Sequence, residues 1–269
     1  MKQRFVFLFA MTAFVTLIFG CGIFSERYEK METEDRTIPI NGKSKLILEN
    51  ISGRIELNQS SDSGTIRLVA KKEISVRKKD LDKPFDEIKI RIDTDGNEIK
   101  IEADINTKTR TKFFNFGSMK GPSVDYELYV PAGFQIELSN VNGDITGDNF
   151  NGDVRIELVN GDVSIRKFSG LFESEITNGE ISMGIDSTTG VDIESINGSV
   201  DLTFGENVSA KLKVETTNGK ILDENLSLSD IKREKKYLKA DLGVNPSTSV
   251  SVSTVNGRIT LKGKGKNFQ

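Results

Sequence analysis

Hydrophobic and polar residues alternate along most of this chain from about residue 37 onward. Single polar residues separate the aliphatic ones, and glycine, asparagine, aspartate or serine bounds each run, as at Ile55 and Leu57, Ile66 and Leu68, and Val154 and Ile156. A period of two over four to six residues predicts β-strands. One segment, 229–239, also fits a helix, or a charged turn that leads into a strand at 237–242. The pattern predicts an almost wholly β protein.

Asn–Gly dipeptides repeat through the second half of the chain. Glycines 143, 152, 161, 170 and 179 lie nine residues apart, with serine in place of asparagine before Gly170. Every second repeat forms a series whose members are separated by 18, 18, 19 and 21 residues: Asn142, Asn160, Asn178, Asn197 and Asn218. We therefore read these asparagines as the turn positions of one repeating structural unit.

Two architectures fit this repeat. Asn–Gly is a strong hairpin signal, which favours an antiparallel β-meander. A β-solenoid with coils of about 18–20 residues would instead place like residues in ladders about 4.8 Å apart. Aliphatic residues recur two positions after the glycines of the series, at Ile145, Val163, Ile181, Val200 and Ile221. An aliphatic residue or threonine also stands directly before each asparagine of the series, at Val141, Val159, Thr177, Ile196 and Thr217.

A meander gives no reason for like residues at every second turn, whereas stacked coils would pack each aliphatic residue on the equivalent residue of the neighbouring coil. Stacked coils would also let the asparagine amides hydrogen-bond along the stack. We favour the β-solenoid and keep the antiparallel β-meander as the alternative.

The N-terminus has the features of an export signal. Lys2 and Arg4 precede an uncharged apolar run at 5–19, which is followed by Gly20 and the lone Cys21. This is the order of a secretory signal peptide, and the run is shorter than the roughly 20 residues of a spanning helix. The sequence Leu-Ile-Phe-Gly-Cys at 17–21 resembles a bacterial lipobox, which implies cleavage before Cys21 and lipid attachment to its sulfur.

We therefore expect a signal peptide at 1–20 and membrane anchoring through lipid at Cys21. Gly22 is not the aspartate that favours inner-membrane retention in enterobacteria, so we expect the outer membrane rather than the inner one. Residues 21–36 alternate acids and bases and are interpreted as a flexible, solvated tether.

Composition excludes several classes of function. The chain has no histidine, no tryptophan and one cysteine, so imidazole-based catalysis and a cysteine zinc site are excluded. Its 37 basic and 40 acidic residues give a net charge of −3 and no reason to expect nucleic acid. The repeat at 151–156 lacks the glycine turn and the ligand aspartate of calcium-binding nonapeptides. We expect no metal and no cofactor.

A phenylalanine-rich segment is the candidate partner-binding loop. Phe113, Phe114 and Phe116 follow Lys108, Arg110 and Lys112 and precede several glycines. Aromatic residues beside bases can bind a partner or a membrane surface. The other interpretation is a lid that covers apolar rungs of the solenoid.

The order of segments resembles the bacterial putative-adhesin family of β-strand-repeat proteins. The resemblance rests on Ile-Ser-Gly-Arg-Ile at 51–55, Tyr-Glu-Leu-Tyr-Val-Pro-Ala-Gly at 126–133, the Asn-Gly-Asp units, and Thr-Val-Asn-Gly-Arg-Ile at 254–259. It implies a single-stranded right-handed β-helix or β-roll. From the sequence pattern we expect one continuous body over 37–263, less regular in 37–133 and with regular Asn–Gly repeats in 134–263. It implies no catalytic residues.

These observations lead to three hypotheses of function. The first is a non-enzymatic, lipid-anchored protein of the bacterial cell envelope, acting as an adhesin or binding scaffold for a protein or polysaccharide partner. The alternative is a periplasm-facing regulatory or scaffold lipoprotein with a protein partner. The third is a small polysaccharide-active enzyme that works without histidine.

Overall fold

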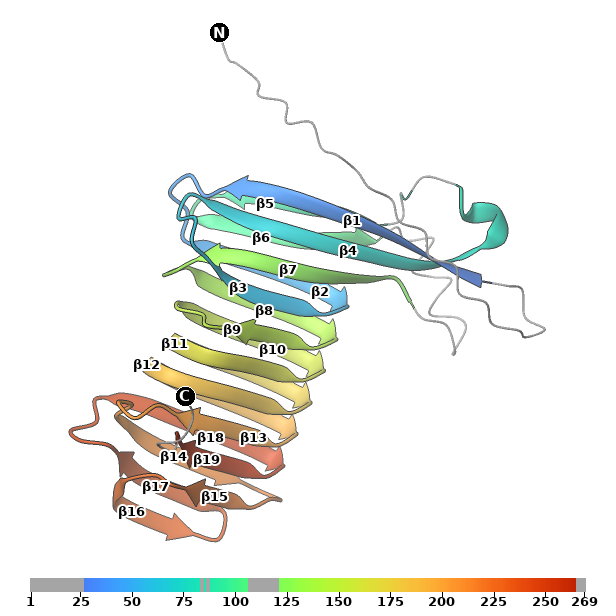
Figure 1. Ribbon diagram of the computed structural model, residues 1–269. Coiled ribbons are helices and arrows are strands. Elements are labelled where there is room, and N and C mark those ends of the chain that lie inside the picture. The colour runs from blue at the N-terminus through green and yellow to red at the C-terminus, as the bar shows by residue number, and fades with distance from the viewer. Residues whose placement is uncertain (1–26, 83–84, 86–87, 106–120, 265–269) are drawn as a thin grey trace.

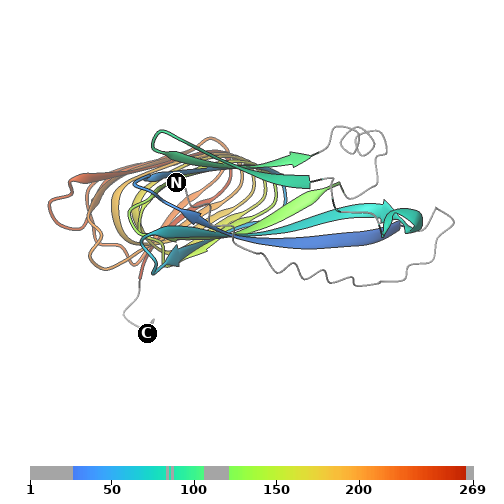
Figure 2. The same ribbon diagram turned by 90° about the horizontal axis from the view of Figure 1, so that it is seen from above.

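The computed structural model describes residues 27–82, 85, 88–105 and 121–264 and shows an all-β protein. These residues form 19 strands and one short 3₁₀ helix, Lys78–Asp80. All strands belong to one mixed sheet, which curls into two facing walls (Figures 1 and 2). None of the helical structure in the described ranges could cross a membrane.

Each wall is a row of neighbouring strands. In spatial order, the first wall contains β5 (Ile88–Asp95), β6 (Glu98–Ile105), β2 (Lys45–Ser52), β8 (Gln135–Asn142), β10 (Asp153–Asn160), the second half of β11 (Val163–Asn178), the second half of β12 (Ile181–Asn197), β18 (Thr248–Asn256), β14 (Ala210–Thr216), β17 (Tyr237–Leu242) and β16 (Leu228–Glu234). The second wall contains β1 (Arg27–Pro39), β4 (Thr65–Arg77), β7 (Ser123–Pro131), β3 (Ile55–Ser60), β9 (Ile145–Asp148), the first halves of β11 and β12, β13 (Val200–Phe204), β19 (Ile259–Gly263) and β15 (Ile221–Glu224).

The middle of both walls is parallel, and strands at the ends of the walls are antiparallel. We call a rung one first-wall strand, its Asn–Gly corner (Ser52–Gly53 in β2–β3) and the second-wall strand that follows. Val154 pairs with Ile136 on one side and with Phe172 on the other, each 18 residues away. Since the rungs with Asn–Gly corners lie parallel to one another, the antiparallel meander does not describe them, and antiparallel pairing in 134–263 is confined to β14–β17 and β16–β17.

The spatial order of the rungs differs from their order in the sequence. The last rung, β18–β19, lies between β12–β13 on one side and β14–β15 on the other. Near the other end, β2–β3 lies between β6 and β7 on the outside and β8–β9 on the inside. A simple stacking of rungs in chain order is therefore wrong at both ends.

Alternate residues of both walls point inward and form one continuous core. The residues two positions after the corner glycines stack as Ile145, Val163, Ile181, Val200 and Ile259, each at most 1% exposed. The buried cluster extends from Ile38 to Leu261, so both the regular and the irregular half contribute to it. Burial of these aliphatic ladders is the main favourable term in the stability of the fold.

The Asn–Gly corners bring glycines of neighbouring rungs into close contact. Gly161 and Gly179 have φ values of +147° and +149°, in a region that favours glycine. A methyl group added at Gly179 would overlap the carbonyl oxygen of Gly161, and one at Gly161 would overlap that of Gly143. Glycine is therefore required at this corner both by backbone conformation and by the approach of the adjacent rung.

The tether predicted over 21–36 is wrong for residues 27–36. Arg27–Pro39 is strand β1, which pairs with β4 along its whole length. The inward side of β1 carries charged residues, and Glu32 and Glu34 meet Lys72 of β4, whose Nζ lies 2.5 Å and 3.3 Å from their carboxylate oxygens. Charged residues on an edge strand discourage further pairing, so the alternating charges belong to a strand and not to a linker.

The helix considered over 229–239 is also wrong. Strands β16 and β17 occupy this segment and pair antiparallel at the C-terminal end of the first wall. The strand at Tyr237–Leu242, which was the other interpretation, is β17. Leu238, Ala240 and Leu242 of β17 are buried. Burial of every second residue therefore outweighs the helix propensity of the charged residues, and the segment forms a strand.

The glycine corner predicts a large effect of Gly179→Ala. The new methyl group would meet the Gly161 carbonyl, so we expect a loss of about 3 kcal/mol or more in the free energy of unfolding. Urea unfolding of the purified full chain measures it. The control is Gly64→Ala, whose methyl would meet only the Asp62 side chain at 3.5 Å. Equal stability of the two variants would contradict the close packing of the corners.

The inward register predicts opposite results at two adjacent positions. Val163 is 1% exposed, so Val163→Asp would bury a charge and should cost about 3–5 kcal/mol. Ser164 points outward on the same strand, so Ser164→Asp should change stability by no more than about 0.5 kcal/mol. Thermal unfolding followed by circular dichroism compares them, and a silent Val163→Asp would refute the register.

Candidate functional site: the striped face of the first wall

The outward side chains of the first wall form parallel columns, because every second residue of a strand points to the same side. Three adjacent columns follow the rungs, two of them over all seven rungs from β2 to β14 and one over the six from β8 to β14, because Ser52 takes the place of asparagine on the β2 rung. We call the three columns together the striped face. They are an acidic column, an aliphatic column and an asparagine column. Figure 1 shows the strands stacked along the walls, with the second wall in front of the first.

The acidic column is made of glutamates interrupted by two serines. In spatial order it contains Glu49, Ser139, Glu157, Glu175, Glu194, Ser253 and Glu215. Neighbouring strands lie about 4.8 Å apart, so carboxylates of adjacent rungs repel one another unless a cation lies between them. This column gives the striped face its negative charge.

The aliphatic column lies between the glutamates and the corner. Its members are partly exposed: Ile51 38%, Val141 38%, Val159 41%, Ile196 48% and Val255 42%. Thr177 and Thr217 occupy the same position on the two remaining rungs. Seven rungs at this spacing make a stripe on the order of 29 Å long. Contiguous exposed apolar side chains of this kind are typical of a contact surface.

The asparagine column is a continuous hydrogen-bonded ladder. The side-chain amide of each asparagine donates to the side-chain oxygen of its neighbour, over 3.0 Å from Asn160 to Asn142, 2.9 Å from Asn178 to Asn160 and 2.9 Å from Asn197 to Asn178. Asn256 then donates to Asn197 over 2.8 Å, and Asn218 to Asn256 over 3.0 Å. All five bonds run in one direction, an arrangement in which each bond polarises the next.

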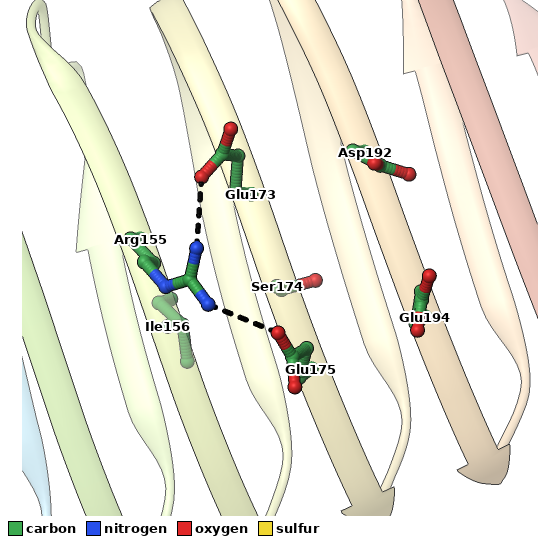
Figure 3. Close-up of a pocket in the computed structure, with 7 residues that line it drawn as sticks. All are labelled: Arg155, Ile156, Glu173, Ser174, Glu175, Asp192 and Glu194. Atoms are coloured by element: carbon green, nitrogen blue, oxygen red, sulfur yellow. Dashed lines mark hydrogen bonds and ion pairs between the residues drawn. The ribbon is translucent and has the colours of Figure 1, made fainter.

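A shallow hollow of about 120 Å³ lies beside the acidic column (Figure 3). Arg155 of β10 reaches across to β11, where its Nη1 lies 3.3 Å from Glu173 Oε2 and its Nη2 3.0 Å from Glu175 Oε1. Asp192 and Glu194 of β12 line the other side. Partial desolvation lowers the pKa of the Arg155 guanidinium, but the nearby glutamate charges outweigh it, and the pKa lies above its usual value.

The side chains of this site offer negative charge beside apolar contact surface. Ser174 lines the hollow, but its side chain is 3% exposed and points toward the core. No cluster of three or more acidic side chains that could hold a metal ion occurs within residues 27–82, 85, 88–105 and 121–264. Carboxylates in a row attract cations and hydrogen-bond donors, and the adjacent aliphatic column offers apolar contact.

A second hollow, of about 490 Å³, lies near the C-terminal end of the stack. Loops after β13, β15, β17 and β19 surround it, and its lining includes Phe204, Val208, Leu226 and Leu242 together with Glu206 and Lys264. Its lining is mostly apolar, which suits a small ligand. It lacks the repetition of the striped face and carries only these two charges.

The predicted site residues divide into two groups. Cys21 and the loop residues Phe113, Phe114 and Phe116 lie outside the described residues. The asparagines Asn142, Asn160, Asn178, Asn197 and Asn218 lie in one column, but Asn256 stands between the last two.

Sequence reasoning missed the acidic column and the exposure of the aliphatic one. The residues before the asparagines form the expected ladder, but they face outward and are partly exposed, which the sequence pattern did not indicate. A signal for the acidic column was present, because a glutamate stands three residues before each of four ladder asparagines, at Glu157, Glu175, Glu194 and Glu215.

A comparison with known protein families matches the C-terminal part of the chain. Residues 148–262 match the family described as Toastrack DUF4097. No protein with a curated description matches the chain. This match confirms the family resemblance inferred from the sequence.

Several solved structures are similar. A putative cell adhesion protein from Clostridium sporogenes is 14% identical, with a TM-score of 0.47 over 87% of this chain and 100% of that one. A putative adhesin from Bacteroides fragilis is 12% identical, with a TM-score of 0.28 over 87% and 97%. A structure from Parabacteroides distasonis described as a putative lipid binding protein is 14% identical, with a TM-score of 0.34 over 85% and 96%. At these scores the likenesses carry no argument about function.

The Arg155 cluster predicts a small, salt-dependent effect on stability. Arg155 is surface-exposed and screened, so Arg155→Ser should lower the free energy of unfolding by less than about 1 kcal/mol. The loss should shrink in high salt, because screening weakens both the ion pairs and the repulsion left among the glutamates. Urea unfolding at low and high salt measures it. A loss of several kcal/mol at both salt concentrations would show that Arg155 has a packing role instead.

Proposed function

We propose that this chain, which carries a toastrack domain of the DUF4097 family, is a non-enzymatic, lipid-anchored protein of the bacterial cell envelope that acts as an adhesin or binding scaffold. The repeated columns of the striped face are the observation that carries this proposal. The apolar leader and the lipobox-like segment ending in Cys21 support the anchor.

We further propose that the body is a single-stranded right-handed β-solenoid occupying residues 37–263, with β1 as an added edge. Parallel pairing at an offset of 18 residues supports this, as does the passage of β11 and β12 from one wall to the other. A rod of stacked rungs is stiff and presents the same chemistry at regular intervals. It is therefore suited to holding a binding surface away from a membrane.

The partner that best fits the striped face is a protein with a basic surface. Five of the seven positions in the acidic column are glutamates; Arg155 contacts Glu157 and Glu175, and Lys100 contacts Glu49. An anionic polysaccharide would be repelled by this column, whereas lysine and arginine side chains would be attracted to it. Contacts repeated on successive rungs are individually weak, and together they give avidity.

A non-enzymatic role is supported by the chemistry of the side chains. The chain has no histidine, and the interior between the walls is filled by one apolar cluster. The carboxylates of the striped face lie on a flat, solvated surface. General acid–base catalysis is favoured in an enclosed site that excludes water, and these carboxylates lie in the open.

Localisation tests the first part of this proposal. Protease shaving of intact cells should remove the domain while a periplasmic control protein survives. Cys21→Ser should release the chain from the membrane fraction, because the variant lacks the sulfur that would carry the lipid. A domain that survives until the envelope is opened would contradict adhesion and favour the periplasm-facing scaffold. A Cys21→Ser chain that stays in the membrane fraction would contradict the lipid anchor.

Charge-matched variants test the binding face. Glu175→Gln with Glu194→Gln should weaken binding of the full chain to a surface coated with poly-L-lysine, because attraction to the acidic column is reduced. Thr146→Lys with Ser164→Lys makes the same change in net charge on the outward side of the second wall and should have a smaller effect. Equal loss in both variants, or stronger binding to alginate than to poly-L-lysine, would contradict the proposed partner.

A further inference from the structure

The Asn–Gly dipeptides of this chain carry a chemical risk. The backbone nitrogen of the glycine can attack the asparagine Cγ, which expels ammonia and closes a five-membered succinimide ring. Water then opens the ring to aspartate or isoaspartate, so that the net change is hydrolysis of the side-chain amide. Glycine favours this reaction because it has no side chain to hinder the attack and a flexible backbone.

The corners of the stack restrain the attacking nitrogen. Four corner glycines donate their N–H to the asparagine carbonyl of the next rung, over 2.9 Å from Gly143 to Asn160, 3.0 Å from Gly161 to Asn178, 2.9 Å from Gly179 to Asn197 and 3.0 Å from Gly198 to Asn256. A nitrogen whose hydrogen points at the neighbouring rung faces away from its own asparagine side chain. Attack requires the backbone to rotate and this hydrogen bond to break.

The ladder restrains the group under attack. The side chain of Asn160 donates to Asn142 and accepts from Asn178, and the side chains of Asn178, Asn197 and Asn256 are held in the same way at both ends. Since the amide nitrogen and the oxygen are both bound, the Cγ atom cannot swing toward the glycine nitrogen without breaking two hydrogen bonds. Both reacting groups are therefore fixed in the middle of the stack.

The ladder ends at Asn218, where these restraints are fewer. Asn218 donates to Asn256, but no described asparagine donates to its side-chain oxygen. Among the described residues, Gly219 donates its N–H to no backbone acceptor, the same holds for Gly257 of the neighbouring rung, and β14–β15 is the last rung with an Asn–Gly corner. Asn256 before Gly257 is nevertheless held at both ends of its side chain, whereas Asn218 is held at one. The remaining restraints are the backbone N–H of Asn218, bound to Val255 O at 2.7 Å, and the Gly219 carbonyl, which accepts from Lys236 Nζ.

Asn151 is the intermediate case. It stands outside the ladder, and the N–H of Gly152 donates to Ser169 O over 3.0 Å. Its attacking nitrogen is restrained although its side chain has no place in the column.

We propose that the stack protects its internal Asn–Gly dipeptides from deamidation and leaves Asn218 as the site of this modification. Conversion there adds a negative charge at the end of the asparagine column, close to Glu215 of the acidic column. Isoaspartate also lengthens the backbone by one methylene group, which disturbs the corner of the last rung. Deamidation of the folded protein would thus begin at one end of the stack.

Mass-spectrometric peptide mapping tests this. The full chain, purified in detergent, is incubated at neutral pH and 37 °C, folded or in urea. In the folded chain, Asn218 should accumulate the most aspartate and isoaspartate, and Asn160, Asn178 and Asn197 should react at least about tenfold more slowly than in urea. Equal rates at all Asn–Gly dipeptides of the folded chain, or a ladder asparagine that reacts faster than Asn218, would overturn the proposal.

A variant separates position in the ladder from local sequence. Asn218→Ala removes the donor to the Asn256 side-chain oxygen, so Asn256 becomes the end of the ladder and should now deamidate faster than in the unmodified chain. Asn178, two rungs farther in, is the internal reference and should keep its rate. An unchanged rate at Asn256 would show that the ladder does not control the reaction.

Discussion

The close approach of neighbouring rungs at the glycine corner is the constraint on which the rest of the structure depends. A methyl group at Gly161, Gly179 or Gly198 would overlap the carbonyl oxygen of the adjacent corner, so only glycine permits the strand spacing there. That spacing sets the backbone hydrogen bonds between corners and the distance between asparagine side chains. The ladder is thus a consequence of the glycines, and the aliphatic core fills the space between the walls that these corners join.

The same constraint shapes the outer surface. Because each rung repeats its neighbour in register, any residue type that recurs in the sequence becomes a straight column on the wall. Glu157, Glu175 and Glu194 illustrate this, since each stands three residues before a ladder asparagine. A surface built in this way offers many equivalent contacts at one spacing, which favours recognition of extended partners over recognition of a single small molecule.

The local sequence pattern predicted much of the fold, but it did not predict the spatial order of the rungs. Alternation gave the strands, and the 18-residue series placed Asn142, Asn160, Asn178 and Asn197 in one column. The insertion of the rung of Asn256 before that of Asn218 could not be foreseen, because both rungs carry the same corner chemistry. Strand β1 was missed because an edge strand rich in charge has the composition of a tether. The acidic column could be identified only once the pairing register of the strands was known.

Hydrogen exchange at the glycine amides tests the central claim most directly. The N–H groups of Gly143, Gly161, Gly179 and Gly198 are bound between rungs, so they should exchange only when the stack opens. Gly42 and Gly121 lie in loops where a side chain would meet open space, and their amides should exchange rapidly. Measured by nuclear magnetic resonance on the full chain, slow exchange at the four corners is the predicted result. Corner amides that exchange as fast as those of the loops would contradict the account.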